Sequence, residues 1–255
     1  DMSKYFTVTV KPTMPVATQI QSNKTDLPFA ATDLFWDWAA FDIPKGAAKL
    51  VHVTLLVRGE DASPQTARNF QLYFAKSHSG GTAPSSMGTG NATVDGTGYY
   101  NELLGGVHLQ ADSFLTNLDY MSMCVTGFGG NTDQIPNLVL QGEPESGTNV
   151  GYDKLYVAGV GGASNTWDFA TGVLANGAVT SGASTDITVD GVDARKVFAK
   201  GDVIHVHDSD TAIGTVSSIP DATSILIESA NGVAIADDDE IVNASPITVI
   251  LSFEQ

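Results

Sequence analysis

Residues 34–58 read LFWDWAAFDIPKGAAKLVHVTLLVR, and FQLYFA follows at 70–75. In both segments large apolar residues recur at every second position, and many of them are β-branched or aromatic. This period is typical of strands that bury one face. The Pro-Lys-Gly sequence at 44–46 predicts a turn between the aromatic lead-in and the long strand after it. The segment therefore predicts long strands at the centre of an all-β domain.

We expect the last predicted strand to belong to the same domain as the first predicted strand. Residues 5–10 alternate in the same way, and so do residues 247–254. The final alternation is longer than the short strands just before it, so we expect it to pair near residues 5–10. No segment keeps a helical period over three turns, and the best helical candidate is 112–121.

From Thr185 onward the predicted strands become short. Turn signals such as Asp190-Gly191 and Asn231-Gly232 separate segments of four or five strand-forming residues. The pattern predicts a small β-barrel at 184–243, inserted into a larger β-sandwich that comprises residues 1–183 and 244–255.

Composition restricts the class of partner. The 255 residues include 12 Lys and Arg against 29 Asp and Glu, which gives a net charge of −17. Such a chain is a poor ligand for nucleic acid or for anionic membranes, both of which need clustered cations. The single cysteine, Cys124, lies in an apolar run and is expected to be a small buried residue. We expect no membrane span and no leader peptide.

Candidate chemistry is sparse. His205 and His207 share a strand face and could chelate a metal with a third ligand, but polar residues on a solvated face are the simpler interpretation. The acidic run 237–240 lacks the calcium-loop spacing and is expected to be a turn. The Gly-rich segments 127–130 and 159–162 match no phosphate loop. No nucleophile elbow or carboxylate pair stands out, so we expect no catalytic residues, metal, cofactor or enzymatic activity.

Aromatic residues offer one alternative. A platform for a sugar needs exposed rings, although core packing is the commoner role of such side chains. The candidates are Trp36, Trp38, Tyr99, Tyr100 and Trp167.

Two segments are poor in large side chains. Residues 79–98 and 158–183 are rich in Gly, Ala, Ser, Thr and Asn, and we expect them to be arms that order against a neighbouring subunit. Trp167 and Phe169 stand isolated in the second arm and are the predicted anchors of a subunit contact.

Two segments resemble proteins of tailed bacteriophages. Phe41 to Leu50 and Asn69 to Ser77 resemble jelly-roll domains of phage virion proteins, and Phe198 to Ile241 resembles small β-barrel modules of phage heads and tails. The resemblance implies a jelly-roll-like β-sandwich with an inserted barrel. It also implies a capsid decoration (cement) protein that forms a homotrimer, binds the major capsid protein on the outside of the head and is assembled in the bacterial cytoplasm. A tail, neck or fibre component and a carbohydrate-binding module remain alternatives.

Overall fold

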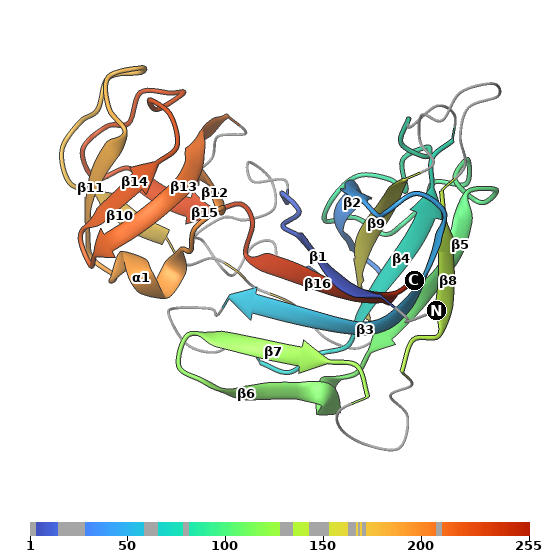
Figure 1. Ribbon diagram of the computed structural model, residues 1–255. Helices are drawn as coiled ribbons and strands as arrows, with labels where there is room; N and C mark the ends of the chain where they lie inside the picture. Colours follow the sequence, from blue (N-terminus) through green and yellow to red (C-terminus); the bar gives the residue numbers. More distant parts are fainter. Residues whose placement is uncertain are drawn as a thin grey trace.

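The computed structural model describes residues 4–14, 29–58, 66–78, 82–127, 135–142, 153–162, 167, 169, 172–207 and 211–255. The described chain is almost entirely β. Two sheets form a sandwich, and a closed barrel lies at one end of it (Figure 1).

The sandwich strands come from the first two thirds of the chain and from its last described strand. They are β1 (Tyr5–Val10), β2 (Leu34–Asp42), β3 (Ala47–Arg58), β4 (Phe70–Lys76), β5 (Leu103–Leu109), β6 (Phe114–Leu118), β7 (Met121–Val125), β8 (Leu138–Gln141), β9 (Lys154–Gly161) and β16 (Ile247–Glu254).

The strand order is that of a jelly roll. One sheet has the order β1-β16-β3-β7-β6, with β8 also paired to β3, and the other has the order β2-β9-β4-β5. Without the additional strands β6 and β8, eight strands remain. Numbered 1 to 8 in chain order, they lie in the order 1-8-3-6 in the first sheet and 2-7-4-5 in the second. This is the double Greek key of a jelly-roll sandwich. The expected jelly-roll-like fold is therefore confirmed.

The core lies between the two sheets and is rich in aromatic rings. Alternate residues of β4, β3 and β16 point inward, as the period of two predicts. Irregular pairing of β2 with β9 lets the adjacent residues Phe35 and Trp36 both enter this core. Trp36 packs over Gly159, where any side chain would collide with the indole, and its Nε1 donates to the Val157 carbonyl at 3.1 Å.

The barrel closes in the order β10-β11-β14-β13-β12-β15. Its elements are β10 (Gly172–Ala175), β11 (Asp186–Asp190), α1 (Ala194–Val197), β12 (Val203–Val206), β13 (Ala212–Asp221), β14 (Ser224–Ile227) and β15 (Glu240–Asn243). Apolar side chains such as Ile187, Ile204 and Ile225 fill the interior. The barrel begins earlier than the expected residue 184, because β10 closes the gap between β11 and β15.

The last strand lies between the first and the third. β16 pairs antiparallel with β1, with Phe6 opposite Phe253, and with β3 on its other side. The expected pairing near residues 5–10 is confirmed. Lys4 and Gln255 exchange two backbone hydrogen bonds of 3.1 and 2.9 Å, so both ends of the described chain lie side by side.

The helical candidate at 112–121 is wrong. Only a 3₁₀ turn, η1 (Ala111–Ser113), is present there, and it leads into the hairpin of β6 and β7. Phe114 and Leu115 pair with β7 instead of forming a helical stripe. Tertiary pairing has overridden a weak local preference.

Two lysines join the barrel to the sandwich. Lys11, just after β1, donates from Nζ to Asp202 Oδ1 at 2.6 Å and to the Lys200 carbonyl at 2.7 Å. Lys196 of α1 lies 4.5 Å from the ring centroid of Tyr120, in the turn between β6 and β7. The backbone adds a bond of 2.7 Å from Met14 N to the Ala244 carbonyl.

Candidate functional site: an aromatic pocket on the outer face of the sandwich

The strongest candidate site lies on the outer face of the β2-β9-β4-β5 sheet. Residues that point away from the core here form a second, smaller apolar cluster, which includes Leu34, Tyr73, Ala158 and Val160. They are brought together by register, since Tyr73 of β4 lies opposite Ala158 of β9. An apolar outer face needs a cover, and the loop between β4 and β5 supplies it.

The covering loop is held firmly to β2. Leu34 N donates to the Ala92 carbonyl at 3.0 Å, and Asn91 N donates to the Leu34 carbonyl at 2.8 Å. Trp38 Nε1 donates to the Ser85 carbonyl at 2.9 Å. A side chain at Gly96 would collide with the Ser86 carbonyl. The glycines of this segment thus allow two stretches of the loop to pack against each other.

This loop corrects an expectation. We expected residues 79–98 to be an arm that orders on a neighbouring subunit. The described part, residues 82–98, orders instead on the sheet of its own chain. In the second expected arm, residues 158–161 belong to β9, and residues 172–183 run into the barrel through β10.

Loop and sheet enclose a pocket of about 400 Å³. Sheet residues form its floor and loop residues form its wall. The lining residues are Thr32, Gln71, Tyr73, Met87, Thr93, Val94, Tyr99, Tyr100, Leu103 and Val160. Three tyrosines thus converge on a space whose volume lies in the range of small-molecule sites.

The aromatic rings are ordered by edge-to-face contacts. Tyr99 packs against Trp38 with 5.8 Å between ring centroids, and against Tyr100 with 5.0 Å. Tyr99 is 5% exposed, whereas Tyr100 is 60% exposed. The buried Tyr99 therefore supports a neighbouring ring that is available to a ligand.

A few polar groups border the apolar surface. The Tyr73 hydroxyl donates to Gln71 Oε1 at 2.9 Å, which orients the Gln71 amide. The hydroxyl oxygens of Thr32 and Thr93 lie 3.5 Å apart. Such amide and hydroxyl groups can donate and accept hydrogen bonds without carrying charge.

The electrostatics disfavour an anion. Burial raises the pKa of Tyr99, and the neighbouring Tyr100, Tyr73, Asp37 and Asp95 raise it further. Asp37 accepts a hydrogen bond of 3.2 Å from the Met87 amide beneath the loop. A negatively charged ligand would meet this same carboxylate field.

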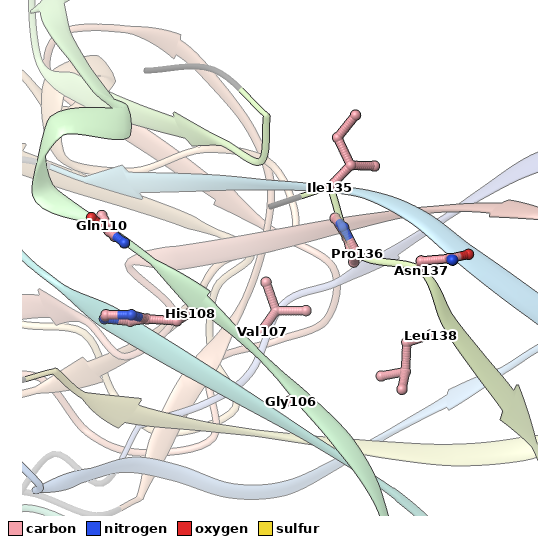
Figure 2. Close-up of a pocket in the computed structure, with 8 residues that line it drawn as sticks. All are labelled: Gly106, Val107, His108, Gln110, Ile135, Pro136, Asn137 and Leu138. Atoms are coloured by element: carbon pink, nitrogen blue, oxygen red, sulfur yellow. The ribbon is translucent and has the colours of Figure 1, made fainter. Parts of the chain in front are cut away.

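A second hollow of about 420 Å³ lies at the edge of β5. Figure 2 shows residues 106–110 on one side of it and residues 135–138 on the other. Its lining combines the apolar Val107, Ile135, Pro136 and Leu138 with the polar His108, Gln110 and Asn137, and it holds no cluster of aromatic rings. We assign no function to it.

The aromatic residues singled out from the sequence divide into two groups. Trp38, Tyr99 and Tyr100 meet at the pocket. Trp36 and Trp167 lie in the main core and cannot form a platform for a ligand. Tyr73 and Gln71 were not singled out, because only the pairing of β4 with β9 shows that they face the pocket.

Trp167 and Phe169 are core residues and not surface anchors. Trp167 is fully buried and Phe169 is 5% exposed. Their rings stack at 6.0 Å, and Phe35 packs edge-on against both. Because these rings are buried within one chain, we withdraw their assignment to a subunit contact.

The remaining candidates have structural positions. The carboxylates of Asp237 and Asp239 accept backbone N–H bonds of 2.7 and 2.6 Å, as expected for an acidic turn before β15. His205 is buried in β12 and His207 is half-buried in the turn just after it, so the expected solvated strand face is wrong for His205. Cys124 is buried, as expected. Among the described residues no three His, Cys, Asp or Glu side chains gather in a way that could hold a metal ion.

No family model, no curated protein and no solved structure matches this chain. No helix in the described ranges is both long enough and apolar enough to cross a membrane.

Proposed function

We propose that this chain is a structural protein of a tailed-phage virion, a decoration (cement) protein that binds the outside of the head and stabilises it. The observation that carries the proposal is the jelly-roll strand order with a second β-barrel inserted between its seventh and eighth strands, β9 and β16. Jelly rolls occur in viral capsid proteins and in lectins. The inserted barrel adds a second surface beside the sandwich, which suits a protein that works by contact and not by catalysis.

Binding to the outer surface of the head is tested by reconstitution. Purified protein is mixed with heads of the source phage that lack it, and the mixture is sedimented through a gradient. We expect saturable co-sedimentation with the heads and a higher temperature of head disruption. Binding to isolated tails and not to heads would favour the tail, neck or fibre alternative, and binding to neither would overturn the virion assignment.

We also propose a homotrimer, and light scattering tests it. The expected mass is three times the chain mass of 26.7 kDa, in solution or once bound to heads. Closed cyclic symmetry is usual for soluble homo-oligomers. A chain that stays monomeric at high concentration and occupies isolated positions on the head would contradict the trimer while leaving head binding intact.

A further inference from the structure

We propose that the aromatic pocket binds a neutral saccharide of one or two pyranose rings. The inference rests on the pocket itself and does not depend on the virion assignment. A sugar ring presents an apolar C–H face and a rim of hydroxyl groups, and the pocket offers a matching surface for each.

The aromatic surface is available to the sugar face. The Tyr100 ring is 60% exposed at the edge of the pocket, and its contact with the buried Tyr99 fixes its position. A tyrosine held in this way gives a large contact surface and loses little rotamer freedom on binding. Val160 and Leu103 extend the apolar floor beneath it.

The polar rim is suited to hydroxyl groups. Gln71 accepts from Tyr73 through Oε1, and its amide NH₂ donates no hydrogen bond within the described part of the chain. Thr32 and Thr93 add hydroxyl groups that either donate or accept. A ligand hydroxyl can therefore be recognised by neutral donors and acceptors together.

Charge and size select the ligand class. Asp37 of β2 and Asp95 of the covering loop both lie near enough to Tyr99 to raise its pKa, and no described Lys, Arg or His lines the pocket. Phosphorylated, sulfated or sialylated ligands would gain no cation and would face two carboxylates. The volume of about 400 Å³ suits a short neutral sugar.

The test uses the full chain and a panel of neutral probes. The panel contains methyl glycosides of glucose, galactose, mannose and N-acetylglucosamine, with their common disaccharides and with glucuronate as the charged comparison. Binding is followed by the indole N–H resonance of Trp38, which packs on Tyr99, and by saturation transfer to the sugar protons. We expect at least one neutral sugar to bind and glucuronate to bind more weakly than glucose.

Three variants locate the binding. Tyr100→Ala should weaken it about tenfold or more, Tyr100→Phe should keep most of it, and Gln71→Leu should weaken it with altered preference among the sugars. Tyr5→Ala is the matched control, because Tyr5 is a 71% exposed tyrosine on β1, in the opposite sheet. Thermal melting should be unchanged for Tyr100→Ala, since its ring is largely exposed.

Two results would overturn the proposal. One is that no neutral sugar binds at concentrations up to about 10 mM, well above the Kd expected of a weak specific site. The other is that sugars bind with equal affinity to the wild type and to Tyr100→Ala.

Discussion

At the scale of single residues, a ring in the core contributes to the packing of the sandwich, whereas an exposed ring at the pocket does not. Phe253 is fully buried and stacks on Phe6, with 5.2 Å between ring centroids, and on Phe41 at 6.3 Å. Removing such a ring leaves a cavity among residues of both sheets. Removing an exposed ring of the pocket leaves the core intact.

Phe253→Ala is expected to destabilise the sandwich by about 3–5 kcal/mol, the usual cost of truncating a buried Phe. Chemical denaturation followed by near-ultraviolet circular dichroism measures the change. Tyr5→Ala, next to Phe6 but on the exposed side of β1, is the control and should have little effect. A shift in Tm of less than about 2 °C for Phe253→Ala would contradict the placement of this ring.

Tyr99 should ionise late in an alkaline titration. Its pKa is raised, first by burial and then by Tyr100 and the nearby carboxylates. The stability that its protonated hydroxyl contributes is full below the unfolded pKa of about 10 and is lost as pH rises through the higher folded pKa. Tyrosinate absorbance measures the titration. Tyr99→Phe should remove a late step that Tyr5→Phe leaves in place.

At the scale of elements, long regular strands could be predicted and short irregular ones could not. The alternation of 51–58, 70–75 and 247–254 identified β3, β4 and β16, because one buried face leaves a clear period of two. β10 was missed, since Gly172–Ala175 has no such period and lies in a run of small residues. Only its pairing partners define it as a strand.

The candidate site was equally hard to predict from the sequence. Trp38, Tyr99 and Tyr100 are conspicuous in the sequence, but so is Trp167, and only the tertiary structure separates pocket from core. Nothing local indicates that a Gly-rich loop packs on its own sheet. Its ordering depends on bonds to β2, from which residues 85–96 are distant in sequence.

The barrel boundary gives a prediction at this scale. A fragment 172–243 should fold, with a β-type circular dichroism spectrum and a cooperative melt. A fragment 184–243 should not, because without β10 the edges of β11 and β15 stay unpaired. Comparing the two melts is the measurement. Equal cooperativity in both fragments would show that β10 is dispensable.

At the scale of the whole molecule, the barrel is held to the sandwich by a buried carboxylate. Asp202 is 1% exposed, and Lys11, Ala199 N and Asn243 Nδ2 donate to it at 2.6, 2.7 and 2.8 Å. Lys11 supplies the positive charge of this cluster and is the donor that comes from the sandwich side of the junction.

Lys11→Met should therefore destabilise the protein by about 3–5 kcal/mol, since it leaves a buried charge without its cation. Urea denaturation measures the change, together with the rate of proteolysis near residue 200. Lys49→Met is the matched control, because Lys49 is half exposed and lies 4.0 Å from Glu254 in a surface pair. Its expected cost is below about 1 kcal/mol. Equal effects of the two substitutions would show that the junction does not depend on this ion pair.

The position of β16 has a consequence for how the chain is made. β1 and β3 leave the ribosome before the barrel, but the strand that lies between them follows the entire barrel. Until residues 247–254 emerge, the nascent sheet keeps two unpaired edges, which are prone to pair with other chains. The barrel, whose strands are contiguous in sequence, can fold first and hold the last strand three residues from its own β15. Completion of the jelly roll thus has to wait until the barrel has been made, and slow emergence of this strand would favour aggregation of newly made chains.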